Sequence, residues 1–298
     1  MEVDTRLLRS FMAVAEEGSL TRAAERVFVS QPALTKQIRQ LETQLGVRLF
    51  DRSRSGMALT GPGRVLARRA PAVLAAWDEA LHATRTAQRQ AARVLRVGFM
   101  ASGANEATQE IVAAFARRRP GWRIELRQAA WTNPSAGLAA GDVDAALLRL
   151  PFPGQDALRV EPLFSEPRWV AMAGTHPLAA RDTIAFHELW DEPFVAAPEG
   201  TGSWRAHWLA ADERGGRPVR IGAVTEQPDD WLNAIASGYG IALAPRSAAR
   251  FYARPGVVYR PVTGVSPTQV AVAWAADDDR NPVVQDFVRC CLDSARGG

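Results

Sequence analysis

The segment from Val29 to Glu42, VSQPALTKQIRQLE, constrains the fold more than any other part of the chain. Leu34, Ile38 and Leu41 recur at the spacing of one helix face. Ser30 is a typical N-cap residue, and the proline two positions later suits a first helical turn, where its missing N–H costs nothing. The segment therefore predicts a helix with one buried face and one polar face.

Two further helices are expected upstream. The stretch DTRLLRSFMAVAEEG places apolar side chains, including Phe11, on one face and ends at Gly18. The stretch TRAAERVF predicts a short second helix with Thr21 as its N-cap. Three helices with a tight connection between the second and third form the pattern of a helix-turn-helix.

A short hairpin is expected to follow these helices. The stretch VRLFDRSRSGMALTGPG alternates apolar and polar residues on either side of a turn at Ser55–Gly56. Its tip carries Arg52 and Arg54. Such a hairpin would be the wing of a winged helix.

Residues 62–90 predict a long helix, because Ala, Arg and Leu dominate them. Pro71 is expected to kink or weaken its first part. A heptad seam runs along this helix through Leu66, Ala70, Val73, Trp77, Ala80, Thr84 and Ala87. With little else nearby to cover such a seam, the helix is expected to pair with another copy of itself.

The polar face of the third helix has the residue types that read duplex DNA. Gln31 can bond adenine, Arg39 and Lys36 can bond guanine, and Thr35 can meet a thymine methyl group or a phosphate. The alternative is an ordinary solvated helix face, which the three-helix context and the arginines of the wing disfavour. The expected DNA-binding residues are Thr21, Ser30, Gln31, Pro32, Thr35, Lys36, Arg39, Arg52 and Arg54.

The distribution of charge supports a nucleic-acid-binding module. Residues 1–93 carry 15 Lys and Arg against 9 Asp and Glu, whereas the rest of the chain is slightly acidic. The two cysteines, Cys290 and Cys291, are adjacent, so neither a disulfide framework nor a metal site is expected, and no cofactor is implied. The absence of a long apolar run and of a secretory signal predicts a soluble, cytoplasmic protein without a membrane span.

From Arg93 onward, stretches typical of strands alternate with helical stretches. VLRVGFM, WRIELRQA and DAALLRL read as strands, EATQEIVAAFARRRPG as an amphipathic helix and SAGLAAGDV as a short helix. The theme continues to a final helix, NPVVQDFVRCCLDSA. This alternation predicts an α/β architecture with a parallel sheet.

The N-terminal stretch LLRSFMAVAEEGSLTRAAERVFVSQPALTKQIRQLETQLGVRLFDRS, with LTGPG after it, resembles the DNA-binding domain of the LysR-type transcriptional regulators. The resemblance extends to THPLA and ASGYGIALAP further on. The residues that carry it include Phe11, Gly18, Ser19, Ala23, Ala24, Ser30, Gln31, Pro32, Ile38, Leu41, Glu42, Leu45, Gly46, Leu49, Phe50, Arg52, Leu59, Thr60 and Gly63.

The resemblance implies a multi-domain α/β protein. It comprises a winged helix-turn-helix at residues 1–60, a linker and dimerisation helix at 61–92, and an effector-binding domain at 93–298. That last domain would be two-lobed and like the periplasmic binding proteins, with lobe I at about 93–162 and 267–298 and lobe II at about 163–266. The implied partners are double-stranded DNA, a small-molecule effector, and further copies of the chain in a homodimer or homotetramer. RNA polymerase is a further possible partner of such a regulator.

An effector is expected beyond the carboxyl ends of strands, near helix N-termini. Polar loops suggest a small carboxylate or other small anion, which Arg149 could pair, and Trp131 suggests a flat one. The alternatives are capping for Ser102, an ion pair for Arg149 and plain core packing for Trp131. The expected effector-binding residues are Ser102, Gly103, Trp131, Thr132, Arg149, Thr201, Gly202, Ser203, Gln227 and Pro228.

An enzyme is not expected. The four histidines are scattered, and neither an HExxH motif nor a GxSxG elbow occurs. Two alternatives to a ligand-responsive regulator stay open. One is a DNA-binding regulator whose second domain serves only oligomerisation or protein contacts, and the other is a solute-binding protein or enzyme with an incidental helical domain.

Overall fold

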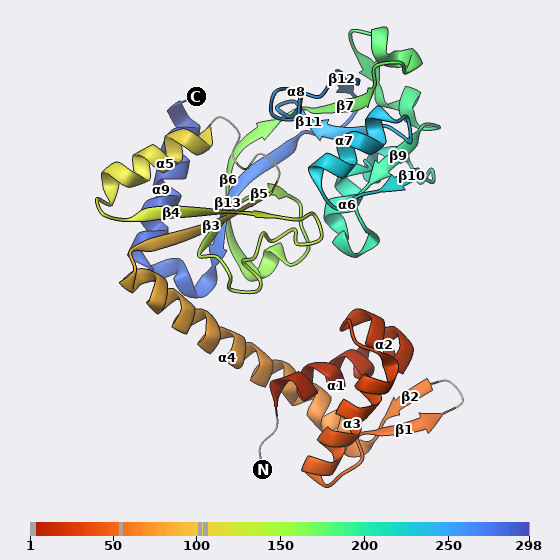
Figure 1. Cartoon of the computed structure of the whole chain (residues 1–298), viewed down its shortest axis with the longest axis vertical. Coiled ribbons are helices and arrows are strands. Elements are labelled where there is room, and N and C mark those ends of the chain that lie inside the picture. Colours follow the sequence, from red (N-terminus) through yellow and green to blue (C-terminus); the bar gives the residue numbers. More distant parts are fainter. Residues whose placement is uncertain (1–3, 54–55, 101–102, 104–106, 298) are drawn as a thin grey trace. The chain divides into compact units, whose positions relative to one another are not determined.

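The computed structural model describes residues 4–53, 56–100, 103 and 107–297 of the 298-residue chain. The chain divides into two compact units, residues 1–83 and 84–298. Figure 1 shows the helices and strands of each unit.

The first unit is a three-helix cluster with a hairpin. Phe11, Leu34 and Leu41 are fully enclosed in its core, on the helix faces that the apolar spacing predicts. The elements are α1 (Thr5–Glu17), α2 (Leu20–Arg26), α3 (Gln31–Leu45), β1 (Phe50–Ser53), β2 (Gly56–Leu59) and the first part of α4 (Gly61–Ala91).

The end of α1 and the start of α3 confirm the capping predictions. Gly18 and Gly46 end these helices in the left-handed conformation, which glycine adopts without a steric cost. Ser30 Oγ accepts the Ala33 N–H at 3.3 Å. For α2 the prediction was wrong, because its N-cap is Ser19, so the helix starts two residues earlier than a Thr21 cap would allow, and Thr21 is exposed within the first turn.

The hairpin is shorter than predicted. Its first strand begins at Phe50 and pairs antiparallel with β2, so the residues just before it form the turn after α3. The Glu42 carboxylate holds this turn by accepting the N–H groups of Leu49, at 2.8 Å, and Phe50, at 3.3 Å. Arg52 lies in β1 opposite Met57. Arg54 lies outside the described residues.

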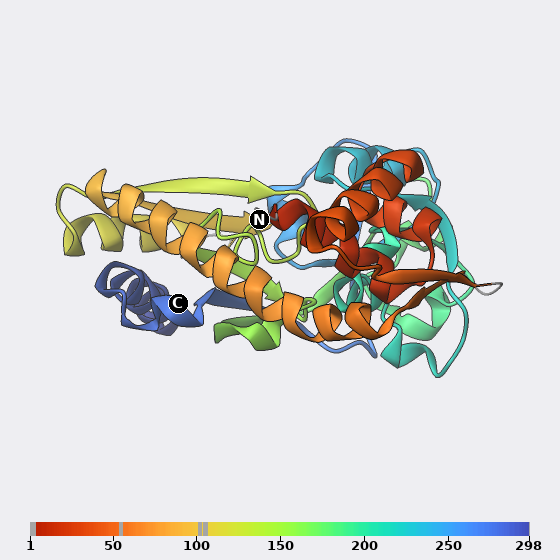
Figure 2. The ribbon, with the colours of Figure 1, turned by 90° about the horizontal axis from the view of Figure 1, so that it is seen from below.

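Helix α4 continues without interruption through the exposed Pro71 (Figure 2). The predicted seam divides in two. Ala70 is buried and Leu66 packs against the core of the first unit, because the short helices leave an apolar face there that α4 covers. Val73 and Trp77 are 52% and 47% exposed. The assignment of Leu66 and Ala70 to a seam between two copies was therefore wrong.

One sheet of the second unit has five strands in the order β4-β3-β5-β13-β6. Helices α5 and α9 lie side by side against it (Figure 1). The elements are β3 (Val94–Met100), α5 (Ala107–Arg118), β4 (Arg123–Ala129), β5 (Ala145–Leu150), β6 (Leu158–Glu166), β13 (Thr268–Ala275) and α9 (Pro282–Gly297).

The other lobe contains a four-stranded sheet in the order β11-β7-β12-β8 and a parallel pair, β9 and β10. Its strands are β7 (Arg168–Ala173), β8 (Ile184–Ala185), β9 (Pro193–Ala196), β10 (Arg220–Val224), β11 (Ala242–Pro245) and β12 (Val257–Thr263). Its helices are α6 (Ser203–Trp208), α7 (Pro228–Ala236) and α8 (Ala248–Phe251).

A parallel sheet was expected, and the five-stranded sheet is mixed. Strand β3 runs parallel to β4 and β5, but β13 runs antiparallel to both of its neighbours, β5 and β6. The topology explains the difference, because β6 leads out of the first lobe and β13 leads back into it from the same side. Neighbouring strands that leave and enter at one end must run in opposite directions.

The helix predicted from SAGLAAGDV is also absent, and these residues form a series of turns. Ala136 and Gly137 have positive φ angles of 49° and 91°, which no right-handed helix accommodates. The carbonyl group of Ala136 is pressed against Gly98 of β3, where an added Cβ would stand 2.1 Å from the carbonyl oxygen. This tertiary contact overrides the local helical preference.

Candidate DNA-binding helix and ligand cavity

The outer face of α3 presents most of the predicted DNA-binding residues. Gln31, Pro32, Lys36 and Arg39 are exposed. Thr35 is half-buried at the edge of this face, and its hydroxyl group donates to the Gln31 carbonyl at 2.9 Å. The hydroxyl oxygen can still accept a bond, but its proton is already used within the helix.

Sequence reasoning missed one basic residue beside this face. The exposed Arg48, in the turn before β1, lines a surface depression together with Thr35 and Arg39. Glu42 and Asp51 line the same depression. Arg48 lies within the stretch that predicted the hairpin, but only the arginines near the tip of that hairpin were expected to contact DNA. Arg48 therefore joins α3 as a candidate contact to DNA.

The second unit encloses a small cavity, with a volume of about 70 Å³, between its two lobes. Met100, Trp131 and Arg149 line it from the five-stranded lobe. The other lobe contributes apolar walls and the aromatic side chains of Trp204, Trp208, Trp231 and Tyr252. A concave, mostly apolar space with a few polar groups is the usual form of a ligand site.

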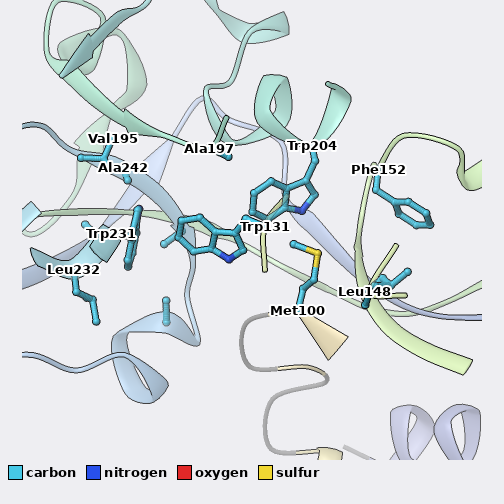
Figure 3. Packing of buried hydrophobic residues seen from close by; sticks show 14 of the residues in the cluster. Met100, Trp131, Leu148, Phe152, Val195, Ala197, Trp204, Trp231, Leu232 and Ala242 are labelled. Atoms are coloured by element: carbon cyan, nitrogen blue, oxygen red, sulfur yellow. The ribbon is translucent and has the colours of Figure 1, made fainter. Parts of the chain in front are cut away.

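Tryptophans dominate the walls of this cavity. The ring centroid of Trp131 lies 5.8 Å from that of Trp204 and 6.1 Å from that of Trp231. Figure 3 shows Trp131 between these two rings, with the side chain of Met100 beside them. Trp204 in turn lies 6.0 Å from Trp208. The four indoles thus form one chain of edge and tilted contacts around the cavity.

Three of these indole groups could each donate a hydrogen bond to a ligand. The Nε1–H groups of Trp131, Trp204 and Trp208 are buried and have no hydrogen-bond partner among the described residues. Because an indole N–H can only donate, these three groups call for an acceptor.

Arg149 joins the two lobes at the wall of the cavity. Its guanidinium group forms an ion pair with Glu166 at 2.8 Å, and both side chains are at least 95% buried. It also donates to Ser247 Oγ at 3.4 Å, while the Ser247 N–H donates to Glu166 at 3.1 Å. Burial lowers the pKa of Arg149, and the charge of Glu166 opposes that shift. The predicted anion partner therefore already has an internal carboxylate.

The structure brings only part of the predicted effector set together. Trp131, Arg149 and Pro228 line the cavity. Thr132, Gly202, Ser203 and Gln227 are exposed and do not line it, and Ser102 lies outside the described residues.

Two more of the predicted residues have local roles instead. Gly103 is a buried turn residue with a positive φ angle, outside the lining of the cavity. The hydroxyl group of Thr201 is buried and donates to the Pro198 carbonyl at 2.7 Å.

Several lining residues were missed. Trp204 and Trp208 belong to the core cluster and also line the cavity. Met100, Trp231 and Tyr252 were not singled out at all. For Trp231 the signal was the high number of tryptophans, nine in the chain, and that count gave none for Met100 or Tyr252.

A buried arginine ties the two interlobe connections together. Arg168, directly after the first connection, donates to the Ser266 carbonyl at 2.6 Å and to Ser266 Oγ at 2.8 Å, in the second connection. It also bonds the His207 carbonyl of α6 and the Glu213 carboxylate. Burial lowers the pKa of His207 to about 4, and Arg168 adds to this shift, so the imidazole is neutral near pH 7.

No helix in the described part of the chain combines the length and apolar character needed to cross a bilayer.

Two family descriptions match the chain. Residues 5–64 match the bacterial regulatory helix-turn-helix protein of the lysR family, and residues 88–296 match the LysR substrate binding domain.

Curated relatives match over almost the whole length. The chain is 30% identical to the HTH-type transcriptional regulator TfdS of Cupriavidus pinatubonensis over 297 residues, which is 99% of each protein. It is 31% identical to the Hca operon transcriptional activator HcaR of Escherichia coli over 295 residues, 96% of each.

Solved structures show the same arrangement of elements. A full-length variant of OxyR from Pseudomonas aeruginosa is 27% identical, with a TM-score of 0.51 over 97% of this chain and 100% of that one. Full-length CbnR in complex with its target DNA is 24% identical, with a TM-score of 0.54 over 98% and 99%. The likeness to CbnR concerns the fold alone.

Proposed function

Since this chain belongs to the LysR family of transcriptional regulators, we propose that its arrangement on DNA responds to a small molecule bound between the two lobes of its second unit. The observation that carries the proposal is the cavity itself. It lies between the lobes, and its lining helix α6 is bonded through the His207 carbonyl to Arg168, which holds both connections between the lobes.

Sequence reading is assigned to α3. Gln31 and Arg39 are exposed, carry the donors and acceptors that base edges require, and lie on the same side of the helix as Lys36. Arg48 and the wing would hold the flanking phosphates, which position the protein without reading sequence. Ser30 contributes by fixing the start of the helix through its cap.

Pairing of two copies is assigned to the exposed apolar side chains of α4. Val73 and Trp77 are each about half exposed and lie four residues apart on one helix face. Two copies that cover these side chains would place two α3 helices on one duplex. A homodimer, and a homotetramer built from two such dimers, follows as the proposed assembly. Its partners would be DNA and RNA polymerase in the cytoplasm.

The proposed response is a shift between two pre-existing arrangements. A ligand that contacts Trp131 in one lobe and Trp204 in the other favours one angle between the lobes. Because α6 is bonded to Arg168, a movement of Trp204 reaches both connections at once. The tetramer then changes how far it bends DNA.

The role of α3 is tested by replacing the side chains that are proposed to contact bases. Gln31→Ala should weaken binding to the preferred operator by about 1–3 kcal/mol and relax selectivity at one base position. Gln88→Ala, which removes an exposed glutamine from α4, serves as the matched control and should leave both unchanged. If Gln31→Ala and Arg39→Ala both keep the affinity and selectivity of the parent, α3 does not read bases.

The alternative is a regulator that binds DNA without an effector and uses its second unit only for assembly. A screen of small molecules by thermal unfolding separates the two. A compound that binds the native protein saturably must raise the unfolding temperature as its concentration increases. A responsive regulator must then also change its footprint on DNA with that compound, whereas the alternative leaves the footprint unaltered.

A further inference from the structure

The cavity between the lobes has the geometry of a site for a flat ring. Trp131 lies between Trp204 and Trp231, so rings from two lobes face the same small space (Figure 3). Aliphatic carbons of Leu209 and the sulfur of Met100 complete an apolar lining. Aromatic side chains in tilted and edge contacts accept another aromatic ring in the same arrangements.

The polar groups of this lining select for acceptors. Trp131 and Trp204 are 9% and 6% exposed, and their indole N–H groups have no partner among the described residues. The indole N–H of Trp208 likewise has no partner among the described residues. A buried donor without an acceptor is unfavourable, and an indole cannot accept. A ligand that presents an oxygen or nitrogen lone pair would satisfy at least one of them.

The charges around the cavity disfavour an ion. Arg149 is already compensated by Glu166 at 2.8 Å, so an anion would gain little there in return for its lost hydration. Arg205 directs its guanidinium group to the Ala197 carbonyl. No carboxylate occurs among the described lining residues, whereas two arginines do, so a cationic ligand would find no negatively charged group in the cavity wall.

From these contacts we propose that the cavity binds an uncharged aromatic compound that carries a hydrogen-bond acceptor, such as a carbonyl oxygen, on its ring. The proposal rests on the function proposed above and names the ligand class of that same site. The surroundings of Arg149 weigh against the small carboxylate or anion that the sequence suggested. The acceptor lies toward the indole N–H groups and the ring lies among the indoles.

The size of the cavity determines the probes. A volume of about 70 Å³ holds a few water molecules, so a ring enters as the indoles or the lobes move apart. The smallest members of the class are therefore the suitable compounds. Acetophenone is uncharged with one acceptor, benzoate has nearly the same shape with a negative charge, and ethylbenzene has that shape without an acceptor.

The experiment is calorimetric titration of the full-length protein with these three compounds and with trimethylphenylammonium as the cation. Acetophenone should bind at least tenfold more tightly than each of the others. Equal or tighter binding of benzoate overturns the uncharged ligand, and equal binding of ethylbenzene overturns the acceptor. Absence of saturable acetophenone binding overturns the proposal as a whole.

Variants locate the site. Trp131→Phe keeps a ring but removes one N–H, so it should weaken acetophenone severalfold and leave ethylbenzene unchanged. Trp122→Leu is the matched control, because Trp122 packs in the other core of the same unit and does not line the cavity. Unaltered acetophenone affinity in both Trp131→Phe and a companion Trp204→Phe variant places the ligand elsewhere.

Failure of this inference differs from failure of the proposed function. If benzoate binds in preference and changes the DNA footprint, the effector response stands and the ligand class is wrong. If acetophenone binds in preference but the footprint is unaltered at saturation, the ligand class stands and the proposed response is wrong.

Discussion

The buried ion pair between Arg89 and Asp144 gives the most specific test of side-chain packing in the second unit. Arg89 lies in the last turn of α4 and bonds the Asp144 carboxylate at 2.7–2.8 Å, just before β5. Both side chains are about 95% buried. The second carboxylate oxygen accepts the Arg96 N–H at 2.9 Å. Asp144→Ala would leave a buried guanidinium group and a backbone N–H without their acceptor.

The expected loss follows from this burial. Removal of one partner of a buried, hydrogen-bonded ion pair costs about 3–5 kcal/mol, because the remaining charge stays desolvated. For a unit of 150–250 residues each kcal/mol shifts the unfolding temperature by about 2–4 °C, so a fall of roughly 6–20 °C is expected. The matched control is Asp142→Ala, two residues away, where Asp142 is 62% exposed and pairs with a half-exposed Arg85 at 3.2 Å. That loss should stay below about 1 kcal/mol.

The assay is thermal unfolding of the full-length variants followed by tryptophan fluorescence, since eight of the nine tryptophans lie in residues 84–298. The double variant Arg89→Met/Asp144→Ala should recover much of the loss, because no unpaired charge stays buried. Equal unfolding temperatures for Asp144→Ala and Asp142→Ala would refute the reasoning, as would a double variant less stable than Asp144→Ala.

Three further predictions concern single residues. Phe28 is 95% exposed with a φ angle of +55°, so Phe28→Gly should stabilise the first unit by about 1 kcal/mol, and a lower unfolding midpoint in urea would contradict this. A Cβ at Gly222 would stand 1.7 Å from the Tyr239 carbonyl oxygen, so Gly222→Ala should cost about 1–3 kcal/mol, whereas Gly200→Ala, with open space around it, should be neutral by the same measurement. Because the pKa of His207 is about 4 in the folded chain and ordinarily near 6.5, the unfolded state takes up the proton first, and stability should fall as the pH drops from 6.5 toward 4. A His207→Gln variant should lose less over that interval in a pH series of unfolding temperatures, and an identical loss would point to other groups.

Local signals predicted the first unit well because its elements end at residues with a strong backbone preference. Gly18, Ser30 and Gly46 set the limits of α1 and α3, and the apolar spacing identified the buried faces between them. The N-cap of α2 was misplaced because two hydroxyl residues, Ser19 and Thr21, compete within three positions. Which of them caps depends on where the turn after α1 ends.

The heptad seam shows the limit of periodicity. A repeat of apolar residues along α4 indicates that this helix face is covered. It does not indicate whether the same chain or a second copy covers it. Leu66 and Ala70 are covered by the same chain, while Val73 and Trp77 are exposed in it. Only the position of the three-helix cluster along α4 separates these two cases.

The ligand cavity was largely beyond sequence reasoning. Its tryptophans at 131, 204 and 231 come from distant segments, and each alone is compatible with a plain core residue. Their convergence and their unpartnered N–H groups are properties of the tertiary structure. The polar loops favoured by the sequence, such as the one at Thr132, instead face solvent.

The central claim is that paired copies read DNA with α3, and selection of binding sites from random duplex DNA by the full-length protein at physiological salt tests it most directly. An inverted repeat with half-sites one or two helical turns apart is predicted. Enrichment of no motif, with binding that only weakens steeply as salt increases, would contradict it and would leave α3 as a surface that holds phosphates.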